Sequence, residues 1–186
     1  MAPQRALFDV STHDGDGERA ATVLPGRGYT CDAPLLHHVR LLLRTRGWSV
    51  RTVRWRTPPA PEQLLDLAPE LLDAVQARQH LVVAKSLSTR ILPLAVQRRL
   101  PGIWLTPLLR EPDLCRAAGR ATAPTLLVGG SADPYWDAAA ARQSGQRVLE
   151  VAGADHSMEV PGDVGASLQS LQAVLAAAGE LLDDVS

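Results

Sequence analysis

Ala84-Lys85-Ser86-Leu87-Ser88 is the stretch that decides the fold, because it places a serine on a sharp turn between a strand and a helix. The run His80–Val83 before it is short, apolar and rich in β-branched residues, which is typical of a buried strand. After it, apolar residues recur at helical spacing over Thr89–Val96. A tight strand-to-helix turn brings two backbone stretches together, so the residues beside its central serine must be small. Ala84 and Ser88 meet that requirement without glycine.

Two later strands end close to residues that complete a pattern with this serine. The strand expected at Thr125–Val128 is soon followed by Asp133, and the strand expected at Arg147–Val151 is soon followed by His156. Ser86 and these two residues therefore each follow the C-terminal end of a strand. In an open parallel sheet the C-terminal strand ends line one crevice, where such folds place their sites.

With this strand–serine–helix turn and the chain order Ser86, Asp133, His156, the sequence resembles the α/β-hydrolase superfamily, and in particular its small members without a lid. The resemblance covers nearly the whole chain, although the glycines usual on both sides of the serine are replaced by other small residues. It implies an α/β fold in one domain, residues 1–186, with a mostly parallel central sheet, helices on both faces and no cap domain. Between Trp104 and Asp133 there is room for only one small helix, so we expect an open site.

The rest of the chain alternates strands and helices, which is typical of βαβ units and a parallel sheet. Two strands, 5–10 and 18–24, flank the turn Thr12–Gly17, and we expect them to pair as a hairpin. A hairpin turn is favoured over a calcium loop here because Pro25 stands where such a loop needs a glutamate. Further strands are expected at 48–55 and 103–105, and helices at 34–46, 61–78, 112–118, 135–143 and 165–182.

The residue types of the three strand ends suit nucleophilic catalysis. Serine is a weak nucleophile at neutral pH and needs a neighbouring base, and histidine is the side chain that accepts and returns a proton near neutral pH. We therefore predict Ser86 as nucleophile, His156 as general base and Asp133 as the carboxylate that orients the imidazole. Asp113 is an alternative acid. Each residue also has a structural interpretation: a turn serine, a packed histidine and a turn-forming aspartate before Pro134.

A reaction through a tetrahedral intermediate also needs backbone donors for the oxyanion. The amide of Leu87, directly after the serine and at the start of a helix, is one predicted donor. The loop Pro25–Tyr29 looks like the oxyanion loop of the family with proline in place of histidine, and by that match Arg27 supplies the second amide, with Gly28 as the alternative. A phosphate-binding loop is excluded because the stretch lacks the third glycine and the lysine of such motifs.

Four aromatic residues fall near the expected mouth of the site in a chain that is otherwise poor in aromatics. Tyr29, Trp104, Tyr135 and Trp136 are candidate walls of a substrate pocket, with ordinary packing as an equally good interpretation. Lys85, the only lysine in the chain, could tune the site electrostatically, but a solvated or salt-bridged side chain is the favoured interpretation.

Composition excludes several classes of function. Nineteen basic and 20 acidic residues leave no electrostatic footprint for nucleic acid, and no apolar run is long enough to span a bilayer. The start, Met1–Arg5, lacks the apolar core of a signal peptide, and Cys31 and Cys115 show no CxxC pairing, so we expect a cytoplasmic protein. The adjacent His37 and His38 diverge on a helix and cannot share a metal, and we expect neither a metal nor a cofactor.

Together these features predict a serine hydrolase that acts through an acyl-enzyme on a small-molecule carboxylic ester or thioester. Two other classes remain open, because a fold does not fix a function. One is an acyltransferase or a cyclase on the same scaffold. The other is a non-catalytic binding protein that retains the fold.

Overall fold

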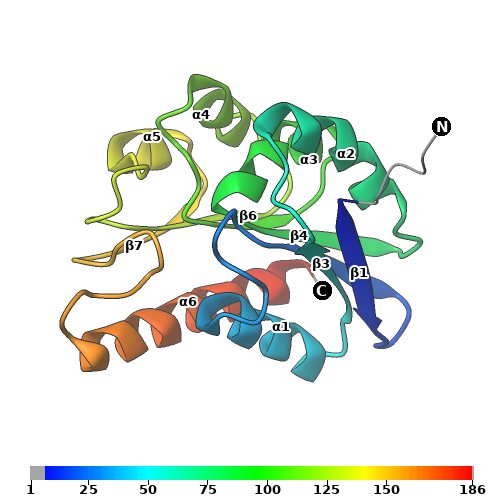
Figure 1. The fold of residues 1–186 in the computed structure, drawn as a ribbon, viewed down its shortest axis with the longest axis horizontal. Coiled ribbons are helices and arrows are strands. Elements are labelled where there is room, and N and C mark those ends of the chain that lie inside the picture. The colour runs from blue at the N-terminus through cyan, green and yellow to red at the C-terminus, as the bar shows by residue number, and fades with distance from the viewer. Residues whose placement is uncertain (1–6, 186) are drawn as a thin grey trace.

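The computed structural model describes residues 7–185, which build one twisted sheet of seven strands in the order β1-β3-β2-β4-β5-β6-β7 (Figure 1). Every neighbouring pair is parallel except β1 and β3, which are antiparallel. The mostly parallel sheet expected from the sequence is therefore confirmed. The strands are β1 (Phe8–His13), β2 (Arg19–Leu24), β3 (Ser49–Trp55), β4 (Gln79–Lys85), β5 (Gly102–Leu105), β6 (Thr125–Gly130) and β7 (Arg147–Val151).

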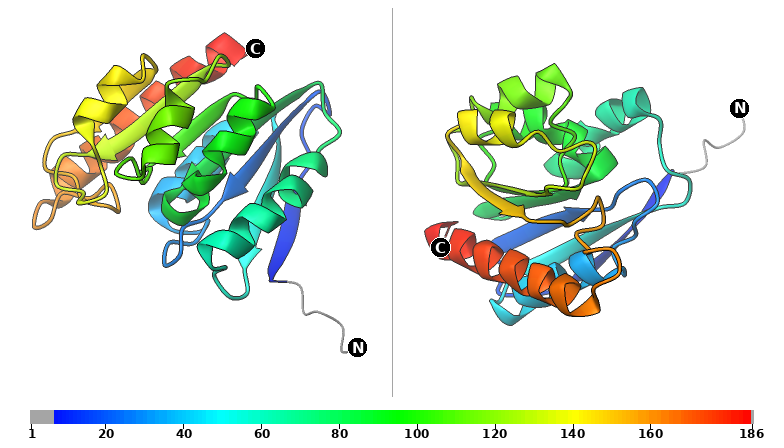
Figure 2. Two further views of the ribbon diagram at one scale, coloured as in Figure 1. Left: turned by 90° about the horizontal axis from the view of Figure 1, so that it is seen from above. Right: turned by 90° about the vertical axis from the view of Figure 1, so that its left-hand side faces the viewer.

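Helices cover both faces of this sheet, as expected (Figures 1 and 2). Within residues 106–124, all of which the structure describes, one short helix lies between β5 and β6, so no cap domain covers the carboxyl ends of the strands. No helix in the described part of the chain is long and apolar enough to cross a membrane. One face carries α1 (Pro34–Thr45) and α6 (Val164–Val185); the other carries α2 (Pro61–Asp73), α3 (Leu92–Gln97), α4 (Pro112–Ala118) and α5 (Ala138–Gln143).

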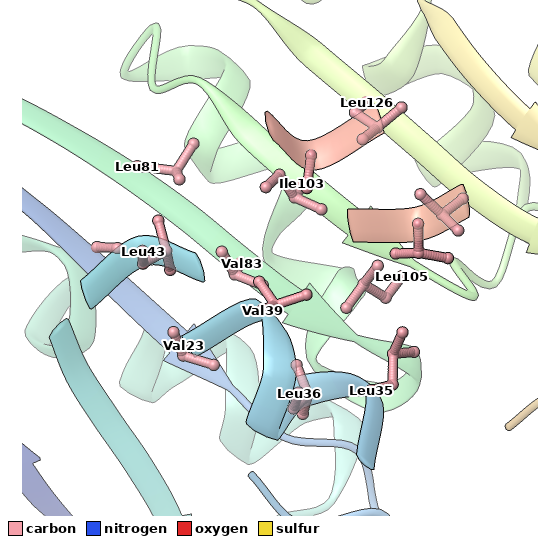
Figure 3. Close-up of a cluster of buried hydrophobic side chains, with 14 of the residues drawn as sticks. Val23, Leu35, Leu36, Val39, Leu43, Leu81, Val83, Ile103, Leu105 and Leu126 are labelled. Atoms are coloured by element: carbon pink, nitrogen blue, oxygen red, sulfur yellow. The ribbon is translucent and has the colours of Figure 1, made fainter. Parts of the chain in front are cut away.

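A hydrophobic cluster joins α1 to the sheet and fixes the first helix of the fold. The apolar side chains of α1 recur at helical spacing and point onto β2, β4, β5 and β6 (Figure 3). Burying each such leucine or valine contributes about 1.5–3 kcal/mol. A second cluster fills the opposite face, so the central strands of the sheet are buried on both sides. The labelled members of the first cluster are Val23, Leu35, Leu36, Val39, Leu43, Leu81, Val83, Ile103, Leu105 and Leu126.

The hairpin expected between strands 5–10 and 18–24 is wrong. β1 and β2 are not neighbours, because β3 lies between them, antiparallel to β1 and parallel to β2. The connecting loop packs on the start of β3, where the amide of Gly15 donates a hydrogen bond to Ser49 Oγ at 3.0 Å. Aspartate and glycine favour a turn without specifying which strand pairs with which. Residues 5 and 6 of the expected first strand lie outside the described residues.

The expected helix 61–78 is also too long, since α2 ends at Asp73. β4 begins at Gln79, and the residues between the two elements return the chain to the sheet. The apolar face predicted for this helix is nevertheless present, with Leu64, Leu71 and Leu72 buried.

A partly buried histidine on β4 links stability to pH. His80 Nε2 lies 2.9 Å from Thr22 Oγ1. Burial, together with the positive charges of Arg51 and Arg98, lowers the pKa of His80 to about 4. In the unfolded chain the same imidazole binds a proton below about pH 6.5. The unfolded state therefore binds more protons between pH 6.5 and 4, and the stability of the fold falls as the pH falls through this window.

We expect the free energy of unfolding to drop by about 2 kcal/mol from pH 7 to pH 5 through His80 alone. A His80→Gln variant, which keeps a polar side chain beside Thr22, should lose this part of the pH dependence. Urea unfolding at the two pH values measures it, with His37→Gln on the exposed side of α1 as the control. An unchanged pH dependence in His80→Gln would show that His80 is not the titrating group.

Candidate active site

Ser86 directly follows β4 and has a backbone conformation that residues other than glycine rarely adopt. Its φ is +51°, and such a conformation costs about 1–3 kcal/mol and persists only where the surroundings hold it. Two hydrogen bonds do so: Ser88 Oγ donates to the carbonyl of Pro25 at 2.5 Å, and Thr89 Oγ1 donates to the carbonyl of Ser86 at 2.6 Å. The sharp strand-to-helix turn expected here is present, although the helix begins as a 3-10 helix, Ser86–Ile91, before α3.

The structure brings Ser86, His156 and Asp133 into one line of hydrogen bonds. His156 Nε2 lies 2.7 Å from Ser86 Oγ, and His156 Nδ1 lies 2.8 Å from Asp133 Oδ2. The aspartate side chain is fully buried, and its other oxygen accepts a bond from the amide of Tyr135 at 2.9 Å. Because a carboxylate only accepts, Nδ1 carries the proton and Nε2 is free to accept the proton of the serine.

The other aspartates near the site have different partners. Asp155 accepts hydrogen bonds from two backbone amides of its own loop, and Asp163 accepts from an amide in the first turn of α6. Asp113 pairs with Arg116 on the exposed side of α4. Among these four aspartates, all in the described part of the chain, only Asp133 touches the imidazole.

A cavity of about 490 Å³ opens beside the serine. It lies where the loops after β2, β4 and β7 meet, at the carboxyl ends of the parallel strands. Three cationic residues and no acidic residue line it. The lining is Gly26, Arg27, Gly28, Tyr29, Pro61, Lys85, Ser86, Leu87, Arg90, Leu108, Tyr135, His156 and Ser157.

The glycine-containing loop after β2 passes very close to the serine. A Cβ placed on Gly26 would lie 3.3 Å from Ser86 Cβ, and the amide of Gly26 donates to the carbonyl of Tyr29 at 3.0 Å, which closes the loop into a turn. The amides of Arg27 and Gly28 donate no hydrogen bond to any acceptor in residues 7–185. Both residues line the cavity, so these two donors remain available to a ligand.

Two of the four expected aromatic walls line the cavity. Tyr29 borders it from the loop after β2, and its hydroxyl accepts a hydrogen bond from the amide of Leu35 at 2.9 Å. Tyr135 is half exposed, and its ring meets that of His156 edge-on, with 4.9 Å between the ring centroids. The Tyr135 ring therefore lies against one side of the imidazole.

The tryptophans Trp104 and Trp136 do not line the cavity, so their assignment as substrate walls is wrong. Both are buried in the second hydrophobic cluster. Each indole packs where a glycine leaves room: a Cβ on Gly102 would lie 2.5 Å from the Trp104 ring, and a Cβ on Gly129 would lie 2.1 Å from the Trp136 ring. The alternative interpretation, ordinary packing, is the one that the structure supports.

Lys85 is neither solvated nor salt-bridged, contrary to the favoured expectation. The side chain is 1% exposed, and no carboxylate of the described residues lies within ion-pair distance. Its Nζ donates to Thr106 Oγ1 at 2.8 Å and to the carbonyl of His156 at 2.6 Å, and lies 4.5 Å from the centroid of the Tyr29 ring. Burial lowers the pKa of Lys85 to about 8. Thr106 was not predicted as part of the site, and nothing in its local sequence marks it.

The cysteine near the site has no catalytic geometry. Cys31 is buried, its Sγ donates to the carbonyl of Val53 at 3.4 Å, and burial raises the pKa of its thiol to about 12. The thiol is therefore protonated at neutral pH and packs as a small apolar group. In the described part of the chain, no three histidine, cysteine, aspartate or glutamate side chains gather as a metal site.

No protein-family model matches this chain, and no curated protein matches it. Solved structures match along almost its whole length. Est1E from Butyrivibrio proteoclasticus, solved with ferulic acid bound, superposes with a TM-score of 0.73 at 12% identity, over 96% of this chain and 95% of Est1E. Dienelactone hydrolase from Anabaena variabilis gives a TM-score of 0.67 at 20% identity, over 96% and 92% of the two chains.

A third solved structure bears on the absence of a cap. XC6422 from Xanthomonas campestris, described as an α/β serine hydrolase without a lid, gives a TM-score of 0.66 at 13% identity, over 95% of this chain and 88% of XC6422. At such identities the likeness establishes the fold rather than the activity. The protein therefore has the α/β-hydrolase fold, in its small form without a cap domain.

Proposed function

We propose that this protein is a serine hydrolase that cleaves a carboxylic ester or thioester of a small molecule through an acyl-enzyme on Ser86. The observation that carries the proposal is the line of hydrogen bonds from Asp133 through His156 to Ser86 at the edge of the cavity. A turn serine and a packed histidine would not need a strained serine backbone aimed at an imidazole whose far nitrogen is held by a buried carboxylate.

In the proposed reaction, Ser86 Oγ attacks the acyl carbon while its proton passes to His156 Nε2. Asp133 stabilises the imidazolium, which returns the proton to the departing alcohol or thiol. Water, activated by the same imidazole, then hydrolyses the acyl-enzyme. Apart from the substrate and this water, every group in the proposed steps comes from the chain, so the reaction would need no cofactor.

The oxyanion formed in both steps would be held by backbone amides. We assign Leu87, directly after the nucleophile, and Arg27, whose amide has no acceptor among the described residues. Gly28 offers an equivalent unpaired amide in the same loop. Such donors contribute about 2.7–4 kcal/mol each to stabilising the transition state.

The named activities of the solved structures support a hydrolase by analogy of fold, since they include a dienelactone hydrolase and an α/β serine hydrolase without a lid. The site without a cap is open to water, which favours hydrolysis over transfer to a second substrate. A cytoplasmic location fits the two cysteines, both of which are free.

Labelling with a fluorophosphonate probe tests the proposal directly. We expect one adduct per chain by intact mass, located on Ser86 by peptide mapping, and no adduct after denaturation in urea. A panel of acyl esters and thioesters of graded chain length, with and without added alcohol or amine, then separates hydrolysis from acyl transfer. A folded protein that takes up no probe and turns over no member of the panel would contradict the proposal and favour a binding protein on this scaffold.

A further inference from the structure

Lys85 is a buried cation at the junction of the elements that build the site. It ends β4 and directly precedes Ser86. Its ammonium reaches Thr106, just after β5, and the main-chain carbonyl of His156, in the loop after β7. It also lies over the ring of Tyr29, in the loop after β2.

We propose that Lys85 is a positioning residue, whose ammonium holds the loops of His156 and Tyr29 in register with Ser86. The inference rests on the proposed serine hydrolase function, because it assigns Lys85 a part in that same site. Lys85 would not touch the reacting atoms; it would act through the residues that do.

The geometry connects the nucleophile and the base through a single side chain. Lys85 precedes Ser86 in the main chain, and its Nζ donates a hydrogen bond to the carbonyl of His156 at 2.6 Å. Hydrogen bonds from a charged donor are shorter and about twice as strong as neutral ones. A displacement of about 1 Å between two reacting groups lowers a rate by about 10²-fold. A hydrogen bond that sets the Ser86–His156 distance should therefore have a large effect on kcat.

The lysine side chain matches its three partners in a way that other residues cannot. An ammonium offers three donors around one nitrogen and no acceptor. Here two donors meet Thr106 Oγ1 and the carbonyl of His156, and the Tyr29 ring presents its face at 4.5 Å. Methionine would fill the same volume without a donor, and the planar guanidinium of arginine is too large and too flat for this arrangement.

Fold stability alone does not account for a lysine at this position. Burying an ammonium without a carboxylate partner is unfavourable, and well-packed apolar residues often replace buried charges at no loss of stability. The buried charge of Lys85 thus lowers the stability of the fold, while its hydrogen bonds order the site. This combination is typical of functional positions.

The charge on Lys85 should be titratable in the working range of the site. Burial lowers its pKa to about 8, against the opposing negative charges of Asp133 and Asp155. Tyr29, whose pKa is raised by burial, also faces the ammonium, whereas His156 meets it through its main-chain carbonyl. Above about pH 8 the neutral amine would hold the His156 loop less firmly, so the turnover number should fall on the alkaline side.

Kinetics of Lys85→Met test the inference, with Arg44→Met on the exposed side of α1 as a matched loss of one positive charge. We expect Lys85→Met to lower kcat by about 10²-fold with KM changed by less than about threefold. The rate of fluorophosphonate labelling should fall by a similar factor. The alkaline limb of the kcat profile near pH 8 should be present in the wild type and in Arg44→Met and absent in Lys85→Met.

A second measurement uses the fact that Lys85 is the only lysine. Selective ¹³C labelling of lysine gives one side-chain signal, whose titration in the wild-type protein reports Lys85 without assignment. We expect its midpoint to coincide with the alkaline limb of kcat, and this comparison remains decisive if Lys85→Met does not fold. Midpoints more than about one pH unit apart, or a folded Lys85→Met with kcat within about threefold of wild type, would overturn the inference.

The same experiments separate this inference from the function on which it rests. A wild-type protein that neither reacts with the probe nor cleaves any ester contradicts the proposed function. A wild-type protein that does both, beside an equally active Lys85→Met, contradicts only the role of Lys85.

Discussion

Replacing Ser86 by alanine should lower the turnover of esters by about three to six orders of magnitude and leave the fold intact. The substitution removes the attacking oxygen and its bond to His156 and nothing from the hydrophobic clusters. Alanine meets the same backbone strain as serine at a φ of +51°, so the turn should persist. What activity remains would come from substrate binding and the oxyanion donors.

Steady-state kinetics on the best ester of the panel, together with thermal unfolding, measure this effect. Ser11→Ala on the exposed edge strand β1 is the matched control, and its kcat should stay within about twofold of wild type. Loss of probe labelling should accompany the loss of turnover in Ser86→Ala. If Ser86→Ala keeps more than about a tenth of wild-type activity on every substrate, another residue is the nucleophile.

The sequence predicted those features that depend on local pattern. Apolar runs predicted all the strands of the parallel part of the sheet, and the small residues around Ser86 predicted the sharp turn that the structure shows. Asp133 and His156 each follow the end of a strand, and parallel strands have all their carboxyl ends on the same edge of the sheet. This pattern was enough to predict that the two residues lie near Ser86.

What failed depends on contacts between distant parts of the chain. The hairpin was wrong because β3 enters between β1 and β2, and a turn sequence carries no information about a third strand. Trp104 and Trp136 were misplaced because the glycines that accommodate them create space visible only after folding. Lys85 was expected to be solvated or salt-bridged because charged side chains are rarely buried without a charged partner, and its partners here come from three different loops.

Asp133→Asn should lower kcat by about four orders of magnitude with little loss of stability. The carboxylate only accepts, so it holds the imidazole with the proton on Nδ1 and leaves Nε2 free to take the proton of Ser86. An asparagine amide in the same place donates to Nδ1, which moves the proton to Nε2 and prevents it from accepting. The asparagine oxygen can still accept the bond from the amide of Tyr135, so the turn should survive.

Asp113→Asn is the comparison that makes this prediction decisive, because Asp113 is the alternative acid that the sequence leaves open. Its side chain is 81% exposed and pairs with Arg116 at the start of α4, so we expect kcat to stay within about twofold of wild type. The pH dependence of kcat for both variants, measured with the wild type, shows whether the base still titrates. A near-wild-type rate for Asp133→Asn together with a collapse for Asp113→Asn would transfer the role to Asp113, and would require the start of α4 to move to the imidazole in solution.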